Sequence, residues 1–82
     1  MDSPPEVEQL LAAVRRLAKD ATPVDTSTPL LSSGLIDSLR LVHLIAEVEK
    51  VAGRRIPDRY LNPVHFNSVG AIERLLGKIR GS

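Results

Sequence analysis

Apolar residues recur every three or four positions in three segments of the chain, which is the spacing of amphipathic helices. The first segment begins at Pro4–Pro5, where proline suits a first helical turn, and ends before Pro23. The second runs from Ser38 to about Gly53, and the third follows Asn67–Ser68. The apolar faces are expected to comprise Val7, Leu10, Leu11, Val14 and Leu17, then Leu39, Val42, Leu44, Ile45, Val48 and Val51, then Val69, Ile72, Leu75, Leu76 and Ile79. No segment alternates strictly between apolar and polar residues, so the pattern predicts three main helices and no strand.

Two irregular connections join these helices. Residues 21–37 are rich in proline, serine, threonine and glycine, and such a long loop is expected to need apolar anchors against the helices. The candidate anchors are Leu30, Leu31, Leu35 and Ile36. Residues 54–66 are predicted to contain at most one short helix, for which Asn62 and Pro63 supply a cap and a first turn. The pattern therefore predicts an all-α single domain over residues 1–82, with its core at about 6–79 and a tail at 80–82.

Composition limits what such a domain can do. The chain has 82 residues, so it buries only about 60–65% of its unfolded surface and has little room for the walls of a substrate pocket. The net charge is +1 and the aromatic residues are Tyr60 and Phe66, which argues against a nucleic-acid partner. The sequence has no cysteine, no long apolar run and no signal peptide. We therefore expect a cytoplasmic protein, monomeric by itself, with no disulfide, no metal site and no membrane contact.

The stretch GLIDSL, residues 34–39, contains the most informative polar residues. Ser38 stands where the second helix begins, and a serine side chain there can cap the helix. Asp37 offers the same cap, which would leave the Ser38 hydroxyl available for another role. A hydrolase would need a base beside the serine, but His43 lies in a different sector of the helix and His65 is distant and alone. The interpretation that remains is a serine modified by another enzyme.

The segment TPLLSSGLIDSLRLVHLIAEVEKVAGRRIPD resembles the core of the acyl and peptidyl carrier proteins. These proteins share a long loop, a glycine, an Asp-Ser-Leu sequence at the head of the second helix and an Ile-Pro pair beyond it. Gly34, Asp37–Leu39 and Ile56–Pro57 match these features with the spacing of the family, and the resemblance extends from about residue 6 to residue 79. It implies an all-α four-helix bundle of carrier-protein type, with three main helices, a short helix III and a long ordered first loop.

The resemblance also implies a cofactor and partners. Ser38, with Asp37 beside it, would bear a covalent 4′-phosphopantetheine arm that a phosphopantetheinyl transferase takes from coenzyme A with the help of magnesium. An adenylating ligase would load an amino acid or a small acyl group onto the arm as a thioester. Downstream transferases, condensing enzymes or tailoring enzymes would receive this cargo. The carrier itself would not be an enzyme.

The second helix departs from the carriers of fatty-acid synthesis, in which this helix is typically acidic. Arg40 and His43 lie on the side that we expect to be exposed, which favours a stand-alone carrier of a specialised pathway, such as peptide or polyketide-like synthesis or aminoacyl transfer. The residues expected to contact partners are Leu39, Arg40, His43, Ala46 and Ile56. In a competing hypothesis, Leu39 does not contact a partner but packs against the leucines of the loop. The alternative functions are a fatty-acid-type carrier and an unmodified helical adaptor or small DNA-binding domain.

Overall fold

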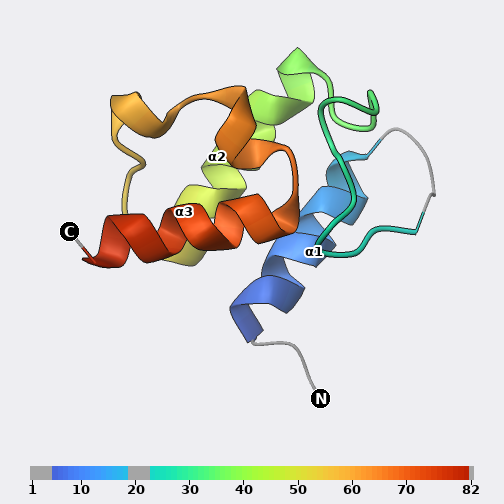
Figure 1. The fold of residues 1–82 in the computed structure, drawn as a ribbon. Helices are drawn as coiled ribbons and strands as arrows, with labels where there is room; N and C mark the ends of the chain where they lie inside the picture. The colour runs from blue at the N-terminus through green and yellow to red at the C-terminus, as the bar shows by residue number, and fades with distance from the viewer. Residues whose placement is uncertain (1–4, 19–22, 82) are drawn as a thin grey trace.

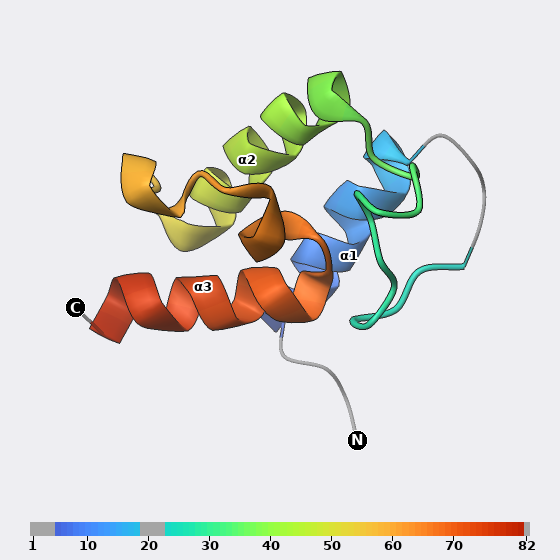
Figure 2. The same cartoon turned by 45° about the horizontal axis from the view of Figure 1, so that its top comes forward.

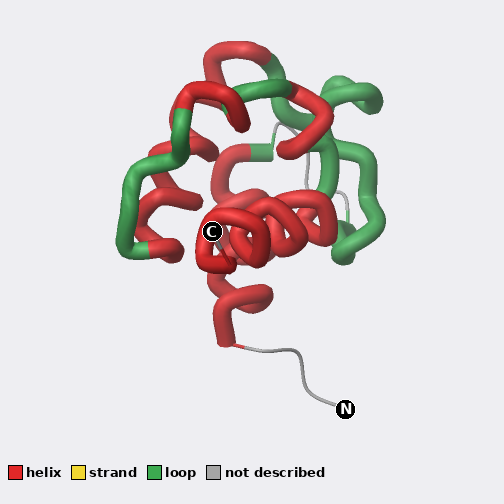
Figure 3. The backbone as a smooth tube through the Cα atoms, turned by 60° about the vertical axis from the view of Figure 1, so that its left-hand side comes forward, coloured by secondary structure: helices red, strands yellow, loops and turns green. Residues whose placement is uncertain are grey.

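Three α-helices dominate the computed structural model, which describes residues 5–18 and 23–81. They are α1 (Pro5–Leu17), α2 (Ser38–Ala52) and α3 (Val69–Gly81) (Figure 1). Two short 3₁₀ helices, η1 (Asp58–Tyr60) and η2 (Pro63–Phe66), lie between α2 and α3, where at most one short helix was predicted. The described residues contain no strand (Figure 3), which confirms the predicted all-α fold. Pro4 and Ser82 lie outside the described residues.

The three helices enclose one apolar core. Helix α1 packs against both α2 and α3, and η2 packs against α3. Figure 2 shows the segment that carries η1 and η2 running beside α2 and α3. All five α3 residues predicted to be buried are buried. Phe66 in η2 is the largest fully buried side chain, and burial of a side chain of this size stabilises a fold by about 1.5–3 kcal/mol.

The ends of the helices follow from local chemistry. Helix α2 stops at Gly53, as predicted, because Gly53 adopts the left-handed conformation (φ 71°) and donates its N–H to the Glu49 carbonyl at 2.9 Å. Asn62 accepts a hydrogen bond from the Val64 N–H at 3.1 Å and caps η2, also as predicted.

Helix α3 continues through Gly81, so Arg80 and Gly81 belong to the helix and not to the tail predicted at residues 80–82. The Arg80 guanidinium donates two hydrogen bonds to the Glu6 carboxylate, at 2.8 Å and 2.6 Å. This bidentate pair joins the first turn of α1 to the last turn of α3. The hydrogen bond to Glu6 also raises the pKa of Arg80 above its ordinary value.

The described part of the loop before α2, residues 23–37, lies beside α1 (Figure 1). Three of the four residues predicted to anchor it are buried, namely Leu30, Leu35 and Ile36, and Leu31 is half-buried. The loop also closes on itself, because the Ile36 N–H donates to the Leu30 carbonyl at 2.9 Å. Gly34, at its tip, has φ 80°, a conformation that glycine adopts readily. The backbone therefore enters the first turn of α2 from a fixed direction.

Candidate functional site

The first turn of α2 is capped by Asp37 and not by the serine that follows it. The backbone of Asp37 is extended, and its Oδ1 accepts a hydrogen bond from the Arg40 backbone N–H at 2.9 Å. The Arg40 guanidinium donates to the other oxygen, Oδ2, at 2.8 Å. One carboxylate therefore satisfies an unpaired amide of the first turn and neutralises a cation on the same turn.

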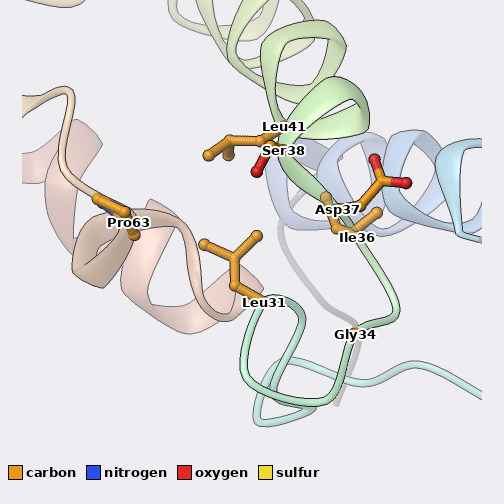
Figure 4. A pocket seen from close by; sticks show the side chains of 7 residues that line it. All are labelled: Leu31, Gly34, Ile36, Asp37, Ser38, Leu41 and Pro63. Carbon is orange, nitrogen blue, oxygen red and sulfur yellow. The ribbon is translucent and has the colours of Figure 1, made fainter.

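The side chain of Ser38, the first residue of α2, is exposed. Its Oγ forms no hydrogen bond with any residue that the structure describes. Figure 4 shows this hydroxyl pointing into an open hollow, whereas the Asp37 carboxylate points away from it. The hollow has a volume of about 360 Å³. The two neighbouring residues thus have separate roles: Asp37 holds the helix and Ser38 presents a hydroxyl.

The hollow beside Ser38 has largely apolar walls. They are formed by Leu31, Gly34, Ile36, Leu41 and Pro63, together with Asp37 and Ser38 themselves. The Leu31 side chain extends from the loop towards the Ser38 side of the hollow, and Pro63 stands on the η2 side (Figure 4). A second hollow of about 240 Å³ shares Leu31 and Pro63 with the first and extends to Val64 and Asn67. An apolar path therefore leads away from the hydroxyl, between the loop and η2.

Asn67 holds the loop wall in place, a role that the sequence did not reveal. Its side-chain Oδ1 accepts hydrogen bonds from the N–H groups of Leu31 at 2.8 Å and Ser32 at 3.1 Å. Its backbone carbonyl accepts a third from the Leu30 N–H at 2.7 Å. The pair Asn67–Ser68 indicates a helix start in the sequence, but nothing in it identifies the distant loop as the partner of Asn67.

The outward face of α2 near Ser38 is mostly apolar. Leu39 is 71% exposed and Val42 is 63% exposed, and His43 and Ala46 are exposed beside them. The hypothesis that Leu39 packs on the leucines of the loop is therefore wrong. Leu39 and Val42 share the apolar spacing of this helix but do not face the core. Arg40 is half-buried, with its guanidinium directed at Asp37.

Ile56 does not belong to this exposed face, which corrects the prediction that it contacts partners. Its side chain is only 4% exposed and belongs to the hydrophobic core. The Ile56 N–H donates to the Glu49 carboxylate at 2.9 Å. This bond ties the chain back to the last turns of α2 and turns the Ile56 side chain inward.

The two histidines do not form a catalytic group with Ser38. His43 is exposed on α2, and His65 packs its ring against the edge of Tyr60, with the ring centres 5.7 Å apart. Ser38 has no hydrogen bond to either histidine among the described residues. The same part of the chain contains no cluster of His, Asp or Glu that could hold a metal ion. Among the described residues, the Ser38 hydroxyl therefore has no hydrogen-bonded general base.

A small helical domain that exposes a serine hydroxyl at a helix start, without a base beside it, is suited to modification by another enzyme. Comparison with protein families agrees with this conclusion. The model of the PP-binding family, described as a phosphopantetheine attachment site, matches residues 8–76, and the chain belongs to this family. Neither the curated proteins nor the solved structures gave a match.

Membership of this family establishes the general character of the protein. It is a non-catalytic carrier protein with a covalent 4′-phosphopantetheine group, and such carriers work with phosphopantetheinyl transferases and biosynthetic enzymes. No helix among the described residues has both the length and the apolar character needed to cross a membrane.

The site at Ser38 fits this group. A phosphodiester on Ser38 Oγ would sit at the positive end of the α2 dipole, near the N–H groups of its first turn. The nearest carboxylate, that of Asp37, is directed away from the hollow and paired with Arg40 (Figure 4). Bound here, the group would supply a thiol, which the cysteine-free chain lacks.

Proposed function

We propose that Ser38 is the attachment residue and that the protein carries an amino acid or a small acyl group as a thioester in a specialised biosynthetic pathway. The observation that carries this proposal is the exposed Ser38 hydroxyl, which no described residue engages and which faces an apolar hollow. In the modification, a bond forms between Ser38 Oγ and the phosphorus of the pantetheine phosphate of coenzyme A. The bond from that phosphorus to the adenosine bisphosphate leaving group breaks, and the transferase removes the hydroxyl proton.

The charges on α2 support a specialised carrier over one of fatty-acid type. The acidic residues of this helix are Glu47 and Glu49, and both are engaged. Glu47 pairs with Arg16 at 3.2 Å and with Lys50 at 3.7 Å, and Glu49 accepts the Ile56 N–H. The surface next to Ser38 consequently offers apolar side chains and not a row of free carboxylates.

Leu39, Arg40, His43 and Ala46 form the proposed partner surface, and Leu39 is its most exposed apolar residue. Large apolar side chains beside a reactive group are typical anchors of protein interfaces. An adenylating ligase is the proposed loading partner, and transferases, condensing enzymes or tailoring enzymes are the proposed recipients of the cargo.

Intact-mass measurement tests the attachment residue. The purified protein is incubated with coenzyme A, magnesium and a broad-specificity phosphopantetheinyl transferase, in parallel with Ser38→Ala and Ser33→Ala. Ser33 is a suitable control because it lies in the adjoining loop and its hydroxyl is already bonded to the Pro29 carbonyl at 2.6 Å. We expect the wild type and Ser33→Ala to gain one phosphopantetheine and Ser38→Ala to gain none.

Two outcomes would contradict the proposal. Addition to Ser38→Ala would place the arm on another residue. No addition to the wild type would favour the unmodified helical adaptor.

A further inference from the structure

Asn67 connects the two walls of the hollow in which the Ser38 hydroxyl lies. It directly follows η2, the short helix that begins with the wall residue Pro63. Its side chain binds the backbone of the loop at Leu31 and Ser32, with N···O distances of 2.8 Å and 3.1 Å. The position of Leu31 and Ser32 relative to η2, and with it the width of the hollow, therefore depends on this carboxamide together with the neighbouring bond from the Leu30 N–H to the Asn67 carbonyl.

Two backbone hydrogen bonds also join the loop to this segment: the Leu30 N–H donates to the Asn67 carbonyl at 2.7 Å, and the Gly70 N–H donates to the Thr26 carbonyl at 2.9 Å. Both lie before Leu31 in the loop, so the Leu31 and Ser32 amides themselves are held by the carboxamide. The bonds from Ile36 N–H to the Leu30 carbonyl and from Gly34 N–H to the Leu31 carbonyl lie within the loop. They preserve its shape but not its orientation. Without the Asn67 side chain, the Leu31 and Ser32 N–H groups would turn to water, and the Leu31 side chain would lose its fixed place opposite Ser38 (Figure 4).

We propose that Asn67 is a positioning residue for the modification of Ser38: it holds the loop wall so that the hydroxyl stands in a hollow of defined shape. This inference rests on the proposed attachment at Ser38. Substitutions at Asn67 change neither the Ser38 hydroxyl nor the catalytic groups of the transferase. Loss of the carboxamide therefore weakens recognition of the carrier and leaves the chemical step intact.

Three asparagine variants test the role. Asn67→Ala removes the acceptor, and Asn67→Asp keeps an oxygen that both N–H groups can bind. Asn62→Ala is the matched control, because Asn62 caps η2 at the Val64 N–H and has no bond to the loop. The steady-state rate of modification is measured with the broad-specificity transferase, at a temperature at which circular dichroism shows each variant to be folded.

For Asn67→Ala we expect the KM for the carrier to rise roughly fivefold to tenfold, which corresponds to one or two net hydrogen bonds, while kcat stays within about twofold. Asn67→Asp and Asn62→Ala should keep a KM close to that of the wild type. Recovery of the KM in Asn67→Asp would show that the side-chain oxygen is the group responsible. Hydrogen exchange at the Leu31 and Ser32 amides should accelerate in Asn67→Ala alone.

The inference is overturned if Asn67→Ala keeps the wild-type KM, if Asn67→Asp is as impaired as Asn67→Ala, or if Asn62→Ala shows the same rise. These outcomes differ from failure of the proposed attachment, in which the wild type itself gains no arm.

Discussion

The separate roles of Asp37 and Ser38 predict opposite effects of substituting two adjacent residues. Ser38→Ala removes a hydroxyl that is exposed and unbonded among the described residues. Because alanine has the highest helix propensity, we expect the free energy of unfolding to stay level or rise by up to about 0.5 kcal/mol. The same variant should accept no phosphopantetheine.

Asp37→Ala should instead weaken the fold. It removes the acceptor of the Arg40 N–H, which is 2.9 Å away, and the ion pair with the Arg40 guanidinium. Loss of an N-cap costs about 1 kcal/mol, and a half-exposed ion pair contributes a few tenths more. We therefore expect a loss of about 1–2 kcal/mol, and each kcal/mol lowers the melting temperature of a domain of this size by about 4–8 °C.

Urea unfolding followed by far-ultraviolet circular dichroism measures both changes, provided that the m-value stays constant across the variants. Asp37→Asn is the control, because it keeps a cap acceptor and loses the charge, so it should retain most of the stability. A loss of more than about 1 kcal/mol in Ser38→Ala would show that this hydroxyl caps the helix and would refute the separation of roles. An unchanged stability of Asp37→Ala would refute it equally.

Two further pairs of substitutions test the packing of α3. Gly77→Ala should stabilise the protein by up to about 1 kcal/mol in urea unfolding, since a Cβ at this helical position meets no atom within 4 Å. Gly70→Ala should destabilise it in the same assay, because its Cβ would lie 3.1 Å from the Thr26 carbonyl oxygen, which the Gly70 N–H already binds at 2.9 Å. Glu6→Gln and Arg80→Gln should each speed amide exchange in the last turn of α3 at low salt, and the difference from the wild type should shrink in high salt.

The helices could be predicted because their determinants are local. The apolar spacing of α3 identified all five of its buried residues, and the glycine signal identified the end of α2 at Gly53. For α2, periodicity identified the helix but not its buried side. Apolar residues occupy more than half of its circumference, and only packing against α1 and the rest of the core distinguishes buried Leu44 from exposed Val42.

Of the proposed site, only Asp37 and Ser38 were predictable from the sequence. Asp37 and Ser38 adjoin each other in the sequence, so the cap and the available hydroxyl could be inferred from their types and order. The hollow could not, because its walls come from the loop and from η2, and the residue that joins them is distant from both Ser38 and Leu31. The prediction for Ile56 failed for a related reason. The hydrogen bond between its N–H and the Glu49 carboxylate turns the side chain inward, and the sequence of this irregular segment does not reveal that bond.

The bonds between the loop and the segment before α3 also have a consequence for the order of events during protein synthesis. Leu31 and Asn67 are separated by 36 positions, and contacts of such long range form after local helices. Ser38 leaves the ribosome well before Asn67 does, so a growing chain exposes the serine without the wall opposite it. The hollow takes shape only when the C-terminal part of the chain has been made and has docked. A transferase that recognises this shape would modify completed carriers but not nascent or misfolded ones. Coenzyme A would then be consumed only for molecules that are able to transfer a cargo.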